Sequence, residues 1–212
     1  MSLFHSILRL LKLILVYIGR CTTYIQGTYL QDSSQSKSWL AWFAGVFSLW
    51  MEVFCFLYKS WIRPLLEYAN TIWHPRLKRD INAIENVQRR ATKMIPGMSN
   101  LSYPERLQAL RLPTLSYRRA RGDMIETYKL LHHLYNIEHR WLLRGGNTTT
   151  RGHTLKLSKS HCKLELRKHC FSFRIVNPWN SLPEHIISAP SLNCFKNRLD
   201  AHWKDNMFLT DC

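Results

Sequence analysis

The chain has 212 residues and a hydrophobic fraction of 46%, which is normal for a folded protein and excludes wholesale disorder. It carries 30 Lys or Arg against 14 Asp or Glu, and the formal net charge of +16 favours a polyanionic partner: nucleic acid, an anionic membrane or an acidic protein. Six scattered cysteines exclude a disulfide scaffold and favour reduced thiols in an intracellular compartment, nucleus or cytoplasm.

The basic character is concentrated after residue 60. Residues 1–60 hold five Lys or Arg and two Asp or Glu, whereas residues 61–212 hold 25 and 12. Residues 1–38 are therefore interpreted as an amino-terminal segment unrelated to the rest. Within it, residues 3–18 predict an amphipathic helix and residues 31–38 predict a polar linker.

Residues 39–57 form the most hydrophobic stretch and predict a helix. Across residues 39–58 only Glu52 is charged, and a helix of this length, at about 1.5 Å per residue, could cross a bilayer. Lys59 and Arg63 would then lie on the cytoplasmic side. A core helix, or noncoding sequence translated by accident, is the alternative, because Glu52 would be costly inside a membrane.

Residues 58–143 predict a helical module. The first helix covers residues 58–73 and begins or breaks at Pro64. Residues 78–95 predict the clearest amphipathic helix, because apolar residues recur every three or four positions and basic residues fall on the opposite side. The apolar positions of this second helix are Ile81, Ile84, Val87, Ala91 and Met94.

Two further helices are expected in the same module. Ser102 and Glu105 have the spacing of a capping box at the start of a short helix. Pro113 begins a longer helix over residues 114–136, in which Arg119 and Asp123 are spaced for an ion pair. The buried stripe of this longer helix is expected to contain Tyr117, Ala120, Met124, Tyr128, Leu131 and Tyr135.

Residues 144–212 predict a loop, short strands and a terminal helix. The loop covers residues 144–152. Apolar residues then alternate with a period of two around residues 155–157, 164–166 and 171–175, which is typical of short strands. Ser191 begins the terminal helix, whose inward side chains are expected to be Leu192, Phe195, Leu199 and Trp203.

No signature of an active site occurs in the sequence. The phosphate-binding glycine loops, HExxH, GxSxG and an adjacent Asp-Asp pair are all absent from it. A two-metal polymerase or nuclease site gathers several carboxylates around divalent ions, and acidic residues are sparse here. The sequence therefore predicts a protein that is not an enzyme and uses no cofactor or metal.

Two smaller motifs could indicate a metal site or an adhesion function. His-Cys pairs at residues 161–162 and 169–170 are zinc-ligand types, but their spacing matches no zinc finger, and adjacent residues of a strand point to opposite faces. The Arg-Gly-Asp tripeptide at residues 121–123 resembles an adhesion motif but lies within a helical pattern. We interpret the tripeptide as chance and predict that the His-Cys pairs bind no zinc.

The basic side chains are the strongest indication of function, although a solvated surface is their ordinary interpretation. The excess is unbalanced and recurs in three elements; on the 114–136 helix, Arg118, Arg121, Lys129 and His132 are expected to lack acidic neighbours. Phosphate contacts need such donors but carry no base information, so backbone binding with little sequence preference is expected. The candidate nucleic-acid-binding residues are Arg89, Arg90 and Lys93; Arg118, Arg121 and Lys129; and Lys163, Arg167 and Lys168.

From residue 58 onward, a series of short motifs stands in order. The motifs include YKS at residues 58–60, LEYA at 66–69, VQRRATK at 87–93, LPTL at 112–115, RGDM at 121–124, NPWNSLP at 177–183 and FKNRLD at 195–200. Together they resemble the carboxy-terminal region of non-LTR (LINE, jockey-like) retrotransposon reverse transcriptases.

This resemblance implies a thumb and downstream region that grips a primer–template and does no chemistry. The catalytic Asp-Asp motif of that family does not occur here, so the resemblance implies a truncated element that binds RNA or RNA–DNA duplex through backbone phosphates. The expected fold is mainly α, a helical thumb-like bundle with a small strand-containing carboxy-terminal part.

Three rival hypotheses stay open at this point. The chain could be a membrane-associated basic protein anchored by residues 39–58, because a basic module also suits anionic lipid. It could be a translated element remnant without an evolved function. It could also complete an active site that a separate polypeptide supplies.

Overall fold

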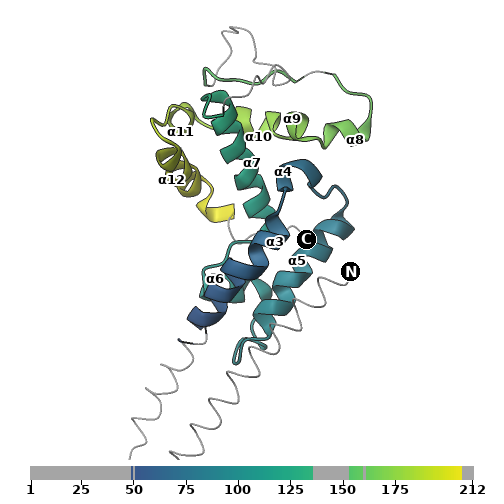
Figure 1. The fold of residues 1–212 in the computed structure, drawn as a ribbon, viewed down its shortest axis with the longest axis vertical. Helices are drawn as coiled ribbons and strands as arrows, with labels where there is room; N and C mark the ends of the chain where they lie inside the picture. The colour runs from purple at the N-terminus through teal and green to yellow at the C-terminus, as the bar shows by residue number, and fades with distance from the viewer. Residues whose placement is uncertain (1–48, 50, 136–152, 160, 207–212) are drawn as a thin grey trace, which may run out of the picture. The chain divides into compact units, whose positions relative to one another are not determined.

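A computed structural model describes residues 49, 51–135, 153–159 and 161–206, and these residues are mainly α-helical (Figure 1). The chain divides into two compact units. Unit 1 combines residues up to Leu66 with Asn86–Leu110, and unit 2 combines Glu67–Glu85 with residues from Arg111 onward. The predicted divisions after residues 38, 57 and 143 stay predictions. The predicted helix at residues 3–18 and the loop at residues 144–152 lie outside the described residues.

Unit 1 contains an irregular helical segment around Pro64. Helical residues 51–57 lead into the π-helix η1 (Tyr58–Ile62), which is followed by α3 (Arg63–Glu67). The backbone N–H of Arg63 bonds to the carbonyl of Tyr58, five residues earlier. Pro64 has no N–H and its ring would crowd the carbonyl of residue 60, so a wider turn just before it relieves that conflict.

Two predicted helices are confirmed over residues 78–110, of which residues 78–85 belong to unit 2 and residues 86–110 to unit 1. The first, α5 (Lys78–Lys93), ends two residues before the predicted boundary. Val87 and Ala91 are buried as expected, whereas Ile81 and Ile84 are only half-buried. The next helix, α6 (Tyr103–Leu110), begins at the predicted capping box, where Glu105 Oε2 accepts from the Ser102 N–H at 2.7 Å. This hydrogen bonding lowers the pKa of Glu105.

The core of unit 1 is small and contains polar groups. Phe54 stacks on Tyr58 with ring centroids 5.8 Å apart, and the Tyr58 hydroxyl donates to Gln88 Oε1 at 2.7 Å. Gln88 is therefore buried with a partner, as burial of an amide requires. The remaining buried apolar side chains of this unit are Ile62, Val87, Ala91, Ile95, Met98, Leu107 and Leu110.

The central helix of unit 2 is α7 (Leu115–Leu131), which contacts α4 (Asn70–Trp73) and the carboxy-terminal helices. Thr114 caps it by accepting from the Tyr117 N–H at 3.2 Å. Its far end is a Schellman motif: His133 has φ 53°, its N–H bonds to the Leu130 carbonyl, and the Leu134 N–H bonds to that of Lys129. The helix therefore ends five residues before the predicted residue 136.

The carboxy-terminal part of unit 2 is a chain of short helices, and the predicted short strands there are wrong over residues 161–180. Residues 165–166 and 171–174, which were expected on strands, lie in helical turns instead, whereas Leu157 forms a single bridge. A run of only three to five residues with apolar side chains does not distinguish a strand from one helical turn, because it is too short to show a period of 2 or of 3.6 residues. The elements are α8 (Glu165–Lys168), α9 (Phe171–Arg174), α10 (Val176–Asn180), α11 (Glu184–Ile187), α12 (Leu192–His202) and η2 (Lys204–Asn206).

The predicted terminal helix is confirmed as α12. Ser191 caps it by accepting from the Cys194 N–H at 3.2 Å, and Phe195 and Leu199 are fully buried. This helix packs on α7, where the ring of Phe195 stacks on that of Tyr128 at 4.4 Å. The predicted buried stripe of α7 is confirmed at Tyr117, Met124, Tyr128 and Leu131, but Ala120 is exposed and Tyr135 lies beyond the helix.

Among the described residues, no helix combines the length and the apolar character needed to cross a bilayer. Most of the predicted hydrophobic helix at residues 39–57 lies outside the described residues.

Candidate nucleic-acid interface

The α5 group, Arg89, Arg90 and Lys93, lies in unit 1. Arg90 and Lys93 are exposed, and neither forms an ion pair with a described acidic residue. Arg89 is half-buried: its guanidinium lies 5.1 Å from the ring centroid of Tyr103, and Nη1 bonds to Asn86 Oδ1 at 3.4 Å. The structure therefore separates two available cations from one that packs on an aromatic ring.

The α7 group is different, because each of its cations has an acidic partner within unit 2. Arg118 forms a two-point ion pair with Glu67, and its Nη2 lies 2.8 Å from Glu67 Oε2. Arg121 makes the same arrangement with Asp200, at 2.8 Å between Nη2 and Oδ2. The expectation that these residues lack acidic neighbours is wrong, because both carboxylates come from segments distant in the sequence.

Lys129 completes this set of paired cations. Its Nζ lies 2.8 Å from Glu126 Oε1, one turn earlier, and 3.0 Å from the Tyr135 hydroxyl. The hydrogen bond with Glu126 raises the pKa of Lys129, and the hydrogen bond with Asp200 raises that of Arg121. The α7 group therefore stabilises the fold of unit 2, and because carboxylates already neutralise its cations, it is poorly suited to bind a phosphate.

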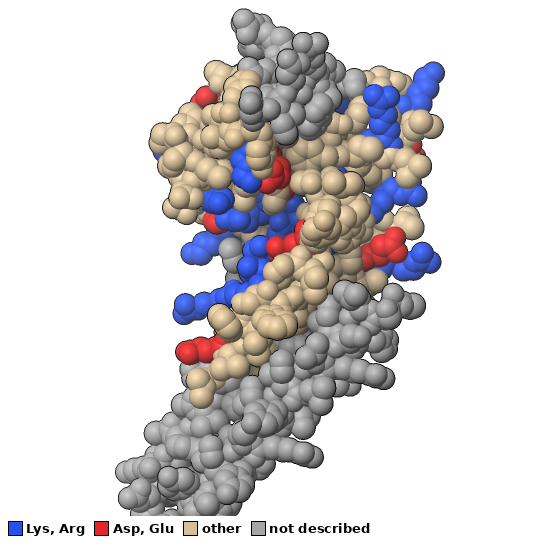
Figure 2. Space-filling view, in the orientation of Figure 1, with Lys and Arg blue, Asp and Glu red and all other residues tan. Residues whose placement is uncertain are grey.

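The α8 group, Lys163, Arg167 and Lys168, is exposed. Lys168 pairs with Glu165 on the surface, a contact that contributes little in water. The Arg167 guanidinium lies 5.3 Å from the centroid of Phe173, and Lys163 has no ion pair among the described residues. On the face drawn in Figure 2, most charged side chains are basic, and they project beyond the surrounding surface.

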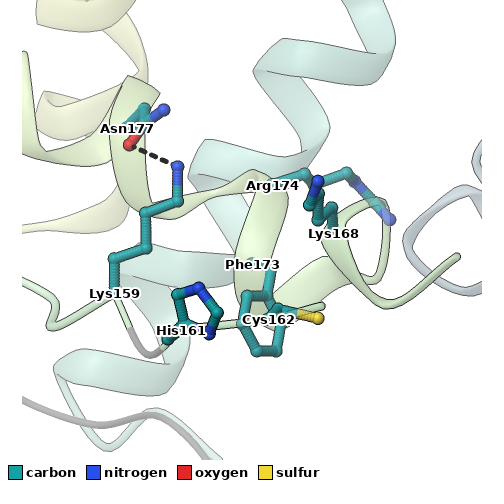
Figure 3. A pocket seen from close by; sticks show the side chains of 7 residues that line it. All are labelled: Lys159, His161, Cys162, Lys168, Phe173, Arg174 and Asn177. Atoms are coloured by element: carbon teal, nitrogen blue, oxygen red, sulfur yellow. Dashed lines mark hydrogen bonds between the residues drawn. The ribbon is translucent and has the colours of Figure 1, made fainter. Parts of the chain in front are cut away.

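A pocket of about 680 Å³ adjoins the α8 group. Its basic side chains come from the segment before α8, from α8 itself and from α9; in Figure 3, Lys159 lies on one side beside Asn177, and Lys168 and Arg174 lie together on the other. The Lys159 Nζ lies 3.4 Å from Asn177 Oδ1 across one edge. The described residues that line the pocket include no acidic side chain; they are Lys159, His161, Cys162, Lys168, Phe173, Arg174 and Asn177.

One wall of this pocket is fixed by Arg174. Its guanidinium binds both carboxylate oxygens of Asp123, at 2.8 Å each, and also the carbonyls of Asn70, Thr71 and His169. Asp123 is buried, so this two-point contact compensates its desolvation. The predicted pair of Asp123 with Arg119 is wrong, because Arg174 occupies the carboxylate and Arg119 donates to Ser116 Oγ at 2.9 Å.

The sequence reasoning did not place Lys159, Phe173, Arg174 or Asn177 in a site. Arg174 lies 51 residues from Asp123 in the chain, and neither composition nor local spacing carries that information. A cluster of basic residues within ten positions could have indicated this site: Lys159, His161, Lys163, Arg167 and Lys168. A strand, however, would place alternate side chains of this cluster on opposite faces.

The smaller motifs have clear positions. No group of three or more metal-ligand side chains gathers among the described residues, including the His-Cys pairs at 161–162 and 169–170. The Arg-Gly-Asp tripeptide lies inside α7, where Arg121 and Asp123 are both held in ion pairs of unit 2.

Acidification is expected to destabilise unit 2 through His74. Burial, followed by the charge of Arg174, lowers the pKa of His74 from 6.5 to about 4, and burial also lowers the pKa of His153. Between these values the unfolded chain binds protons that the folded chain does not, so stability present above pH 6.5 is lost as the pH falls toward 4. Thermal melts followed by circular dichroism at neutral pH and at about pH 5 measure this loss.

The His74→Gln variant should show a shallower dependence of the melting temperature on pH. The His185→Gln variant is the matched control, because His185 is exposed and should leave the dependence unchanged. Equal pH dependence in the wild type and the His74→Gln variant would show that His74 is not the group responsible.

Comparisons of the chain with protein-family models, with curated proteins and with solved structures find no match.

Proposed function

We propose that this chain is a non-catalytic nucleic-acid-binding module, derived from the carboxy-terminal region of a non-LTR retrotransposon reverse transcriptase, that binds RNA or RNA–DNA duplex through backbone phosphates. The observation that carries the proposal is the presence of exposed cations without acidic partners among the described residues, on α5 and on the segment around α8. In a chain of net charge +16, such donors attract polyanions and contact phosphates without reading bases.

The two surfaces have different residues available. On unit 1, Arg90 and Lys93 stand three positions apart on α5, which places them on neighbouring turns of one helix face. On unit 2, Lys163 and Arg167 project from the segment around α8, with Lys168 beside them. The α7 group is omitted from the proposed contacts, because its charges are already compensated by Glu67, Asp200 and Glu126.

Replacing Arg90 and Lys93 together by Gln should weaken binding to RNA–DNA duplexes of unrelated sequence by the same factor. Each duplex phosphate neutralised contributes about 0.9 to the slope of log affinity against log salt, so this variant should lose roughly 1.8 from the slope. Filter binding over a salt series measures both quantities. The helix should persist, because Gln is a good helix former.

The matched control is the double variant Lys78→Gln and Lys204→Gln, which removes the same charge from exposed positions outside both surfaces. It should change the slope much less. If both double variants change the slope equally, net charge alone governs binding, and the proposed α5 contact is wrong.

A further inference from the structure

The pocket between α8, α9 and α10 combines cations with an accessible aromatic ring, a pairing that phosphate binding alone does not need. Phe173 lines it from α9, His161 lines it from the preceding segment, and Lys159 and Lys168 lie at its edges (Figure 3). We propose that this pocket binds one unpaired nucleotide of a single-stranded nucleic acid, with the base on Phe173 and the backbone phosphates on either side of it on Lys159 and Lys168. This inference rests on the proposed function and specifies the substrate form that unit 2 selects.

The ring of Phe173 is placed where a base could stack on it. The Arg167 guanidinium lies over this ring, 5.3 Å from its centroid, and Phe173 lines the pocket whereas Arg167 does not. Phe173 is half-buried, and it is not among the side chains that pack on the hydrophobic core, whereas its neighbour Phe171 is. A base is the ligand group that suits an aromatic ring in a pocket with a cation beside it.

The charges of the pocket suit a phosphate. Arg174 is held by Asp123 and by three backbone carbonyls, so it forms a rigid wall and has little charge to offer. Among the described residues, Lys159 is bonded to the Asn177 amide oxygen alone, at 3.4 Å, and Lys168 is paired with one exposed carboxylate, that of Glu165. Both ammonium groups can turn to an anion at small cost, because exposed ion pairs are weak.

The size of the pocket selects the form of the ligand. A volume of about 680 Å³ lies within the range of pockets that enclose one small organic ligand. A paired base cannot reach Phe173, because its faces are covered by its neighbours in the duplex. Single strands are recognised through splayed bases on aromatic side chains, so an unpaired nucleotide is the form that fits.

The full chain is tested by filter binding to an unstructured oligouridine and to an RNA–DNA duplex. Phe173→Leu keeps most of the apolar volume but removes the aromatic face, and it should lower the ratio of single-strand to duplex affinity by roughly 5- to 150-fold. Lys159→Gln should lower the same ratio, whereas Lys204→Gln, an exposed cation outside the pocket, should leave it unchanged. An unchanged ratio in both pocket variants overturns the proposal.

A second measurement needs no substitution. The Cys162 thiol lines the pocket, whereas Cys170 is exposed and does not. Saturating oligouridine should slow alkylation of Cys162 by iodoacetamide, read by mass spectrometry, and should leave Cys170 unaffected. Equal alkylation of Cys162 with and without oligouridine overturns the proposal.

The two proposals fail in distinguishable ways. If the wild type binds neither oligouridine nor duplex, the proposed function itself is wrong, and the pocket assignment falls with it. If the wild type binds duplex through Arg90 and Lys93 but Phe173→Leu binds oligouridine as the wild type does, only the pocket assignment is wrong.

Discussion

Replacing Arg174 by Met is expected to lower the free energy of unfolding of unit 2 by about 3–5 kcal/mol. The substitution leaves Asp123, only 4% exposed, without its ion-pair partner, and it removes three hydrogen bonds to backbone carbonyls. A buried carboxylate without a partner has lost its hydration and has no ion pair to compensate for it. Removing one partner therefore destabilises the protein by more than the net stabilisation that the whole ion pair contributes. Hydrogen–deuterium exchange resolved by peptide over α7 and α9 reports unit 2 separately from unit 1.

The double variant Arg174→Met and Asp123→Leu separates the two contributions. Replacing both members of a buried pair by apolar side chains is often neutral, so much of the lost stability should return. Glu165→Gln is the control, because its ion pair with Lys168 is exposed and should contribute little. A single variant as stable as the wild type would show that Asp123 is not buried against Arg174 in solution.

Replacing Trp179 by Ala should lower the free energy of unfolding of unit 2 by a similar amount, about 3–5 kcal/mol. Trp179 is fully buried, its Nε1 donates to the Leu155 carbonyl at 2.8 Å, and its ring lies 6.1 Å from the rings of both His153 and Phe195. The substitution therefore leaves a cavity and an unpaired carbonyl in the same core. Urea denaturation followed by far-ultraviolet circular dichroism measures the change.

Trp61→Ala is the matched control, because Trp61 is 68% exposed on η1. It should change stability by about 0.5 kcal/mol or less, as most surface substitutions do. If the two Trp variants are equally stable, the core centred on Trp179 does not hold unit 2 together.

The mainly helical fold was predictable where one helix face carries most of the apolar side chains. The helices α5, α6, α7 and α12 follow from apolar periodicity and capping residues, because both signals are local. The end of α7 was not predictable, since a Schellman motif normally uses glycine and here uses His133. The helices α8 to α10 were missed because each has only one turn, too short to show a helical period.

The candidate site was predictable in part. The exposed positions of Arg90, Lys93, Lys163 and Arg167 follow from their side of each helix or their place in a polar stretch. The pairing of Arg118, Arg121 and Arg174 did not follow, because their partners lie 51 or more residues away along the chain. Charge counting treats every cation alike, and only tertiary structure shows which ones are compensated.

The distant partners of α7 also impose an order on folding during synthesis. As the chain is made from its amino terminus, α7 appears well before α12, which supplies Asp200 for Arg121 and Phe195 for Tyr128. Until α12 has been made, the apolar face of α7 is not covered by Phe195, and Arg121 lacks its ion pair with Asp200. The nascent chain should therefore pass through a stage that is prone to aggregation, and completing unit 2 must await closure of a long loop.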